Sequence, residues 1–371
     1  MSRYPNVDYS VFEIRTDLEL YWTNRYALFK SYGYVLRPRF KPDWVPSWKY
    51  DLSISPMDAE DHISWHVWVP GLMDARRISD RALVIFKKVK TESEEVKLAT
   101  YLSSEPLRQD PNNHCVPILD VIVDEEDPAV SFLVMPYLRH INDPLFDTVG
   151  SILDCIGQLL RGLVFLHSHN IAHRDCAYKN LMFDATAMYT QGFHPVTLIT
   201  LPDNVSRFAP YSQRSQVGAT YYFTDFGIST RFAPDEQNRL VTGMDGLDQE
   251  LPELSDDVPY DPFKADVFIL GNMIRTRLHY KYRNVDMIEP LMASMIHPNP
   301  RRRPTAKQAL ERFEKIQKEC SFLRRVWRAE IRTESVVARV VLDSRSLEID
   351  LFLVFYSARI YILICMFGKE E

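Results

Sequence analysis

Glycine and cysteine are both scarce in this sequence. Only 12 of the 371 residues are glycine, against 23 prolines, which indicates stiff connections rather than flexible linkers. The five cysteines are scattered, odd in number and without paired spacing, which argues against a disulfide framework and a zinc site. This usage fits reduced thiols, so we expect a cytoplasmic protein.

A surplus of positive charge is also absent. The formal net charge of -6 argues against nucleic-acid binding, because that function requires a basic field. Met1 to Pro5 open a polar stretch without an apolar core, so we expect no secretory signal. Hydrophobic residues make up 46% of the chain, enough for one large core or two moderate ones.

The hydrophobic pattern changes along the chain. Residues 1–62 are rich in aromatics and proline, and we expect an extended arm that packs its rings on a neighbouring surface, with partner docking as the alternative. Residues 63–137 contain apolar runs typical of strands. Residues 138–325 include apolar positions that recur at three and four, which predicts helices. The pattern therefore predicts an α+β fold with a strand-rich small lobe and a helical large lobe.

Two segments interrupt or follow this pattern. Residues 182–224 form a long polar detour, of a kind that is usually functional or partly disordered. Residues 326–371 form a tail whose segment 351–367 is apolar but carries Arg359. That segment lies at the short end of the roughly 17–25 residues that span a bilayer. A central arginine costs about 2.5–3.5 kcal/mol on insertion. We expect a docked terminal helix there, with a membrane anchor as the alternative.

Two motifs point to phosphoryl transfer. His173-Arg174-Asp175 is followed by Asn180 with the spacing H-R-D-x-x-x-x-N. In that pattern the Asp positions a substrate hydroxyl and the Asn helps to hold a metal ion. A second carboxylate lies in Asp225-Phe226-Gly227, after an apolar and aromatic run, as a metal-binding Asp at a strand end should.

With these motifs, residues from about Arg81 to Leu323 resemble a eukaryotic-type protein kinase. Further marks fall in the family's order: a strand lysine, a helix glutamate, an A-P-E-like tripeptide, a helix aspartate and a late R-P-T, at Lys87, Glu95, Leu251-Pro252-Glu253, Asp266 and Arg303-Pro304-Thr305. Glu92 and Glu94 are rivals of Glu95, and Lys88 is a rival of Lys87. The aromatic N-terminal region and the long detour also resemble kinase-like proteins common in mushroom-forming fungi.

The resemblance implies ATP and Mg²⁺ as cofactors and a protein as substrate. Asp225 and Asn180 would hold magnesium, and Asp175 would accept or orient the proton of the substrate hydroxyl. Lys87 would hold the α- and β-phosphates and would itself be fixed by Glu95.

The resemblance also assigns roles outside the catalytic carboxylates. The backbone of Pro136 and Leu138 would face the adenine. Arg174 suggests control by phosphorylation of the activation segment, with acceptors among Ser229, Thr230 and Thr242. The alternative is that these three are ordinary loop hydroxyls.

Two departures bear on activity. No G-x-G-x-x-G precedes Lys87, and the stretch from Trp65 to Asp80 contains only Gly71. Without glycines the backbone cannot approach phosphates in the usual way. Arg76 or Arg77 could substitute through charge, although solvated surface arginines are the simpler interpretation.

The second departure lies in the catalytic loop. Ala177 occupies the place where serine/threonine kinases usually carry lysine, and Lys179 stands two residues later. We interpret Lys179 as a candidate contact of the γ-phosphate, with plain surface charge as the alternative.

The sequence therefore predicts a protein kinase that phosphorylates serine or threonine, with tyrosine less favoured. The alternative is a pseudokinase scaffold that binds partners without transferring phosphate, because the glycine loop is missing. A small-molecule kinase of the aminoglycoside or choline type shares the catalytic spacing, but the R-P-T, A-P-E-like and DFG marks count against it.

Overall fold

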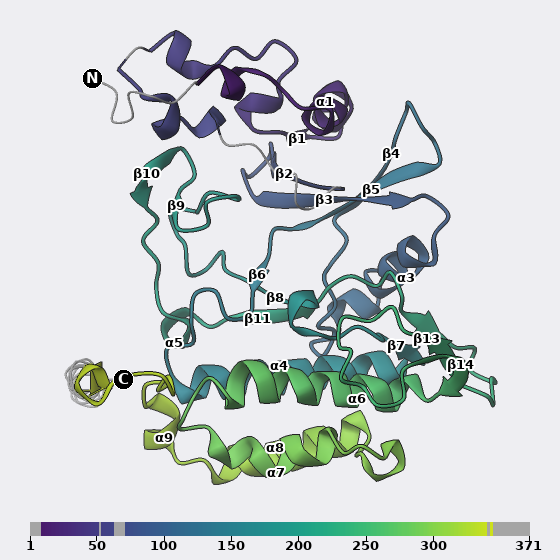
Figure 1. The fold of residues 1–371 in the computed structure, drawn as a ribbon. Coiled ribbons are helices and arrows are strands. Elements are labelled where there is room, and N and C mark those ends of the chain that lie inside the picture. The colour runs from purple at the N-terminus through teal and green to yellow at the C-terminus, as the bar shows by residue number, and fades with distance from the viewer. Residues whose placement is uncertain (1–8, 52, 63–70, 340–341, 344–371) are drawn as a thin grey trace, which may run out of the picture.

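The computed structural model describes residues 9–51, 53–62, 71–339 and 342–343. A mixed α+β chain folds into two lobes, with an antiparallel sheet in the N-terminal part and a bundle of helices in the C-terminal part (Figure 1). This is a two-lobed fold of the protein-kinase type, as the sequence predicted.

A five-stranded antiparallel sheet forms the small lobe in the order β1-β2-β3-β5-β4. Its central strand β3 alternates its side chains, with Val84 and Phe86 buried on one face and Lys87 on the other. Strand β4 is shorter than the apolar run 116–123 suggested. The bounds are β1 (Tyr34–Val35), β2 (Leu72–Arg77), β3 (Leu83–Lys90), β4 (Asp120–Val123) and β5 (Val130–Pro136), with helix α3 (Glu94–Leu102) below the sheet.

The N-terminal region is not an extended arm. It contains helices α1 (Asp17–Asn24) and α2 (Tyr26–Ser31), and it supplies edge strand β1 to the sheet. Thr16 and Glu19 form a capping box that starts α1. The prolines of residues 38–56 permit only short 3-10 turns: η2 (Pro38–Phe40), η3 (Ser47–Lys49) and η4 (Pro56–Asp58), preceded by η1 (Tyr9–Glu13) and followed by η5 (Glu60–His62).

An aromatic core joins this region to the sheet. Phe29 of α2 packs on Phe86 and Phe132 with ring centroids 4.5 and 5.0 Å apart, and Trp22 lies 5.5 Å from Phe132. The expected packing of N-terminal rings on a neighbouring surface is present, but helices supply the rings. The extended-arm prediction is wrong, because Thr16 and Glu19 cap a helix and the rings of α1 and α2 are buried against the sheet.

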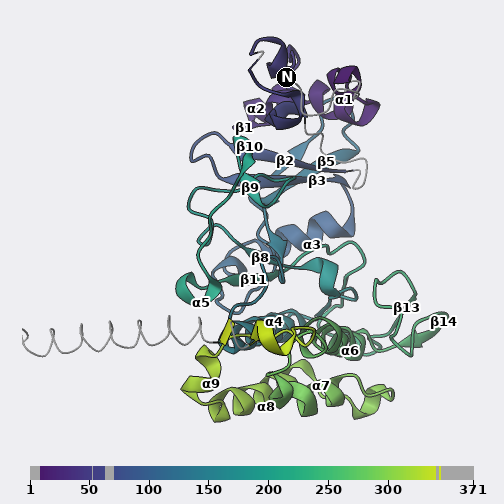
Figure 2. The same cartoon turned by 60° about the vertical axis from the view of Figure 1, so that its left-hand side comes forward.

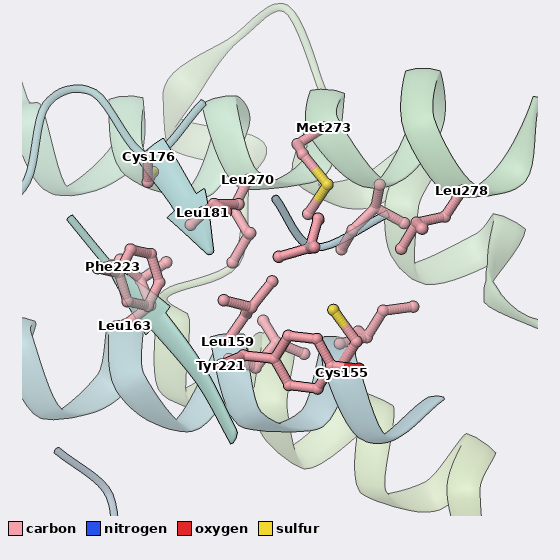
Figure 3. Packing of buried hydrophobic residues seen from close by; sticks show 14 of the residues in the cluster. Cys155, Leu159, Leu163, Cys176, Leu181, Tyr221, Phe223, Leu270, Met273 and Leu278 are labelled. Carbon is pink, nitrogen blue, oxygen red and sulfur yellow. The ribbon is translucent and has the colours of Figure 1, made fainter. Parts of the chain in front are cut away.

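The large lobe is built around the long apolar helix α4 (Val149–Ser168). Leu159 and Leu163 of α4 face Leu270 and Met273 of α6 across the core (Figure 3). The remaining elements are α6 (Pro262–Met273), the π-helix η8 (Ile274–His279), η9 (Asp286–Ile288), α7 (Glu289–Met295), η10 (Pro300–Arg302), α8 (Ala306–Glu319) and α9 (Phe322–Val326). Helix α4 is long and apolar enough to cross a membrane, but 72% of its apolar window is buried inside this core.

Short strands position the catalytic motifs between the lobes. Strand β8 (Leu181–Asp184) pairs with β6 (Arg139–His140) and β11 (Thr220–Phe223), and β7 (Ile171–Ala172) pairs with β12 (Thr230–Arg231). In the segment after Asp225, β13 (Val241–Gly243) pairs with β14 (Ser255–Tyr260). Short 3-10 turns lie at η6 (Leu107–Gln109) and η7 (Tyr178–Asn180).

The long detour between β8 and β11 folds against the small lobe. It contains β9 (Thr200–Leu201), β10 (Asn204–Phe208) and α5 (Arg214–Val217). The segment runs along the side of the small-lobe sheet and reaches the N-terminal region (Figures 1 and 2). Buried His194 contacts Glu60 at 3.2 Å, and the Tyr137 hydroxyl donates to the carbonyl of Pro195. The insertion therefore links the large lobe to residues 53–62.

The C-terminal tail is described only to residue 339 and at 342–343. The apolar segment 351–367 and Cys365 lie outside the described residues, so the docked-helix and membrane-anchor predictions stay predictions. The other four cysteines, Cys115, Cys155, Cys176 and Cys320, are free thiols.

Candidate active site

The catalytic loop is held in place by one buried carboxylate. Asp266 of α6 is fully buried and accepts hydrogen bonds from the backbone N–H groups of His173 at 2.8 Å and Arg174 at 2.6 Å. These bonds hold Arg174 in a left-handed conformation, with φ at 67°. Such strain persists only where the surroundings fix it, and it is common at functional sites.

Asp175 and Asn180 face one another within this loop. The Asn180 side-chain amide donates to the carboxylate of Asp175 at 2.8 Å and to its backbone carbonyl at 3.0 Å. Burial raises the pKa of Asp175, although a hydrogen bond from the Leu247 backbone N–H partly opposes this. A carboxylate with a raised pKa suits general-base work better than a fully solvated one.

Lys87 joins three elements at the other side of the site. Its ammonium contacts the carboxylate of Glu95 on α3 and lies 2.9 Å from Asp225 Oδ1. Burial alone would lower the pKa of Lys87, but the two carboxylates outweigh it and the pKa is raised. Burial alone would raise the pKa of Asp225, but the Lys87 ammonium outweighs it and the pKa is lowered. Lys87 and Asp225 are thus both held in their charged forms.

The rival residues point elsewhere. The carboxylate of Glu94 is 83% exposed and pairs with Lys97. The ammonium of Lys88 lies over the ring of Tyr21, on the other face of the sheet from Lys87. Adjacent residues of a strand point to opposite faces of the sheet, so Lys87 and Lys88 point apart. Adjacent residues of a helix point to different sides, so Glu94 and Glu95 do as well.

The segment after β11 is anchored against the His173 ring. Phe226 is buried against the ring of His173, with centroids 5.1 Å apart. Asp225 has φ of 63°, and its carboxylate accepts from the N–H of Gly227 at 3.3 Å. This turn directs the carboxylate of Asp225 toward Lys87.

A cavity of about 410 Å³ lies between the lobes and is lined by the predicted nucleotide and metal residues, whereas Asp175 and Arg174 are not part of its lining. Its lining includes Lys87, Glu95, Asn180 and Asp225, and on the hinge side Pro136 and Leu138. Largely apolar side chains from both lobes complete the wall, as expected of a nucleotide site. The structure thus brings together the predicted nucleotide and metal residues, although their roles stay predictions.

The roof of this cavity differs from a glycine-rich loop. Gly71, with φ of 97°, lines the cavity just before β2. Arg76 and Arg77 do not: Arg77 pairs with Asp80 in solvent, and Arg76 lines a different cavity. Neither arginine therefore replaces the missing glycines, and the surface interpretation is correct.

The donor set fits magnesium and a nucleotide. In the described residues, no three His, Cys, Asp or Glu side chains cluster as a metal cage. Magnesium in phosphoryl-transfer sites instead uses one or two protein groups together with substrate phosphates. The carboxylate of Asp225 is half-exposed. The side-chain nitrogen of Asn180 points to Asp175, so the side-chain oxygen of Asn180 points away from the Asp175 carboxylate. A bound Mg²⁺ would supply charge neutralisation for the phosphates.

The segment that follows Asp225 folds over the catalytic loop. Arg174 donates to the carbonyls of Ile228 at 3.2 Å and Thr242 at 2.6 Å, and its Nε is buried without a partner among the described residues. Further along, Glu253 is paired with buried Arg303 through two contacts, one of 2.7 Å. The A-P-E-like and R-P-T marks thus meet.

One contact of Asp175 was not predicted from the sequence. The backbone N–H of Leu247 donates to Asp175 Oδ1 at 2.8 Å. The close approach uses Gly246, because an added Cβ there would lie 3.2 Å from the carbonyl oxygen of Arg174. No side-chain pattern signals a backbone donor, so only the structure could reveal it.

Lys179 is the least settled of the predicted residues. It is exposed, and it lines both the cavity between the lobes and a smaller cavity beside the loop of residues 173–180. In the described part of the chain it forms no ion pair.

The two-lobed α+β fold is of the protein-kinase type. Comparisons with known proteins agree at that level, although no family model matches the chain. A stretch of 110 residues, 27% of this chain, is 30% identical to probable cyclin-dependent kinase 10 of Dictyostelium discoideum and covers 30% of it. A stretch of 175 residues, 41% of this chain, is 27% identical to serine/threonine-protein kinase ppk25 of Schizosaccharomyces pombe and covers 34% of it. The chain thus spans about a third of the length of these curated relatives. These similarities support a relationship to the protein kinase superfamily.

Proposed function

We propose that the chain is an ATP- and Mg²⁺-dependent protein kinase that transfers the γ-phosphate to a serine or threonine hydroxyl of a protein. The observation that carries the proposal is the position of Lys87 between Glu95 and Asp225, across one cavity from Asn180, whose side-chain amide is hydrogen-bonded to Asp175. Phosphoryl transfer depends mostly on positioning and charge neutralisation, and these groups supply both.

Each group takes the role that its contacts allow. Lys87, fixed by Glu95, holds the α- and β-phosphates. Asp225 and Asn180 hold the metal, and Asp175 takes or orients the hydroxyl proton. Pro136 and Leu138 line the adenine end of the cavity.

Phosphate transfer from radiolabelled ATP to a broad peptide library tests the proposal. Wild type should label peptides, and Asp175→Asn should lose at least about 100-fold in rate, because general acid–base catalysis contributes about 10²–10⁴-fold. Equal labelling by both proteins would contradict the assignment of Asp175.

A pseudokinase scaffold is the second candidate, because two observations favour it. The described roof has Gly71 but no glycine-rich turn, and the Leu247 N–H occupies one oxygen of Asp175. Calorimetric titration of ATP with and without magnesium distinguishes an enzyme from a scaffold that binds no nucleotide. Magnesium-dependent binding supports the enzyme, whereas absence of binding leaves only a scaffold.

Arg174 provides a site for regulation within the proposed function. Thr230 Oγ1 lies 3.4 Å from the Arg174 guanidinium, and the Thr242 carbonyl also contacts it. A phosphate on Thr230 would give this guanidinium an anionic partner, because the Thr230 hydroxyl already lies beside it.

A further inference from the structure

A second cavity, of about 260 Å³, opens beside the catalytic loop. Tyr178 and Lys179 of the loop form one side, and Arg277 of η8 forms part of the other. Lys179 also lines the nucleotide cavity, so the two cavities meet at this side chain.

The charged groups in this cavity are unequally paired. Asp248 accepts two contacts from the Asn272 amide, at 3.0 and 2.8 Å, and one from the N–H of Glu250. Glu250 is itself paired with Arg275. The acidic groups therefore have local partners.

The two cations do not have such partners. Lys179 and Arg277 are both exposed, and neither forms an ion pair within the residues that the structure describes. The Arg277 guanidinium lies over the ring of Tyr178, 4.5 Å from its centroid, and the same ring stacks with His140. Stacking on Tyr178 orients Arg277 while leaving its hydrogen-bond donors free for an anion.

The cavity borders the reacting end of the site. Leu247 lines it and donates its N–H to Asp175, and Lys179 directly precedes Asn180. A peptide whose hydroxyl reaches Asp175 would therefore pass neighbouring residues across this cavity. Any anionic side chain close to the acceptor would meet the two cations there.

We propose that Lys179 and Arg277 select substrates that carry an anionic side chain next to the acceptor hydroxyl, either a carboxylate or a phosphorylated residue. This inference rests on the proposed kinase function. It gives Lys179 a peptide contact in addition to the γ-phosphate contact expected from the sequence.

The test uses four short, fluorescein-labelled peptides with one central serine. Their flanks carry glutamate, alanine, lysine, or a phosphoserine in place of one glutamate. Affinity is measured by fluorescence anisotropy, and kcat/KM by phosphate transfer. Wild type should bind the glutamate peptide about three- to tenfold more tightly than the alanine peptide, a range set by exposed ion pairs. The preference should shrink as salt rises from about 0.05 to 0.5 M.

Charge reversal locates the preference. Arg277→Glu should abolish the glutamate preference and improve binding of the lysine peptide. Lys307→Glu on α8, an exposed residue in the lower part of the large lobe (Figure 1), makes the same charge change and should keep the preference.

The phosphoserine peptide distinguishes the two anion sources. Stronger binding of that peptide than of the glutamate peptide assigns a phosphorylated residue, and the reverse order assigns a carboxylate. Equal wild-type affinity for the glutamate, phosphoserine and alanine peptides would overturn the proposal, as would an unchanged preference in Arg277→Glu. Selective binding without any phosphorylation would leave this site standing and refute the kinase function instead.

Discussion

The ammonium of Lys87 lies between the carboxylates of Glu95 and Asp225, and so ties β3 and α3 to the turn after β11. The contact crosses from the small lobe to the large lobe. The charged cavity between the lobes is therefore organised by the chain itself, which reduces the reorganisation needed when a nucleotide binds.

Glu95→Gln should lower kcat/KM for ATP by about 10- to 100-fold. The neutral amide no longer fixes the Lys87 ammonium, and small misplacements at a reacting centre cost about this much. Glu94→Gln is the matched control, because that side chain is 83% exposed one residue away. Equal losses in both variants would show that Glu95 has no special position.

Transfer should fall as the pH drops through the pKa of Asp175, because the carboxylate is the form that accepts a proton. Burial raises that pKa. The acidic limb of kcat/KM should therefore lie above the usual aspartate pKa of about 3.9. Rates measured from about pH 4 to 8 test this, with circular dichroism as the control for unfolding. A profile that stays flat until the protein unfolds would contradict it.

Arg303→Met should lower the free energy of unfolding by about 3–5 kcal/mol, because it leaves the carboxylate of Glu253 without its cation. The Arg303 side chain is 0% exposed and that of Glu253 13% exposed. Arg325→Ala breaks a surface pair with Asp154 and should change stability by less than about 0.5 kcal/mol. Urea unfolding measures the stability of both variants. Similar losses of unfolding free energy would contradict a stabilising role for the buried pair of Arg303 and Glu253.

His194→Phe should loosen the insertion from the small lobe. The Nδ1 of His194 accepts from the N–H groups of Val196 and Thr197, so Nε2 carries the proton that it donates to Glu60. Removing these hydrogen bonds should lower the free energy of unfolding by about 1–3 kcal/mol.

Hydrogen exchange should then rise across the insertion, residues 185–219. The control Ser206→Ala removes only an exposed contact with Asp58 and should change little. Unchanged exchange in His194→Phe would mean that other contacts hold the insertion.

The sequence predicted the two lobes and the contact of Lys87 with Glu95, because both depend on side-chain type and spacing. Lys87 and Glu95 could be placed since a strand and a helix have fixed periods. The helices of residues 17–31 were not predicted, because the proline and aromatic content of residues 1–62 favours an extended segment. The path of the insertion was also missed, since His194 and Glu60 lie 134 residues apart in sequence. The Leu247 contact was invisible because its donor is a backbone N–H.

The proposed activity is phosphate transfer by the groups around the cavity between the two lobes. The most direct measurement is the initial rate of γ-phosphate transfer from Mg²⁺-ATP to peptide, compared for wild type, Asp175→Asn and the exposed control Asp235→Asn. We expect equal rates for wild type and Asp235→Asn, and a loss of at least about 100-fold for Asp175→Asn. A wild-type rate no higher than that of Asp175→Asn would contradict it.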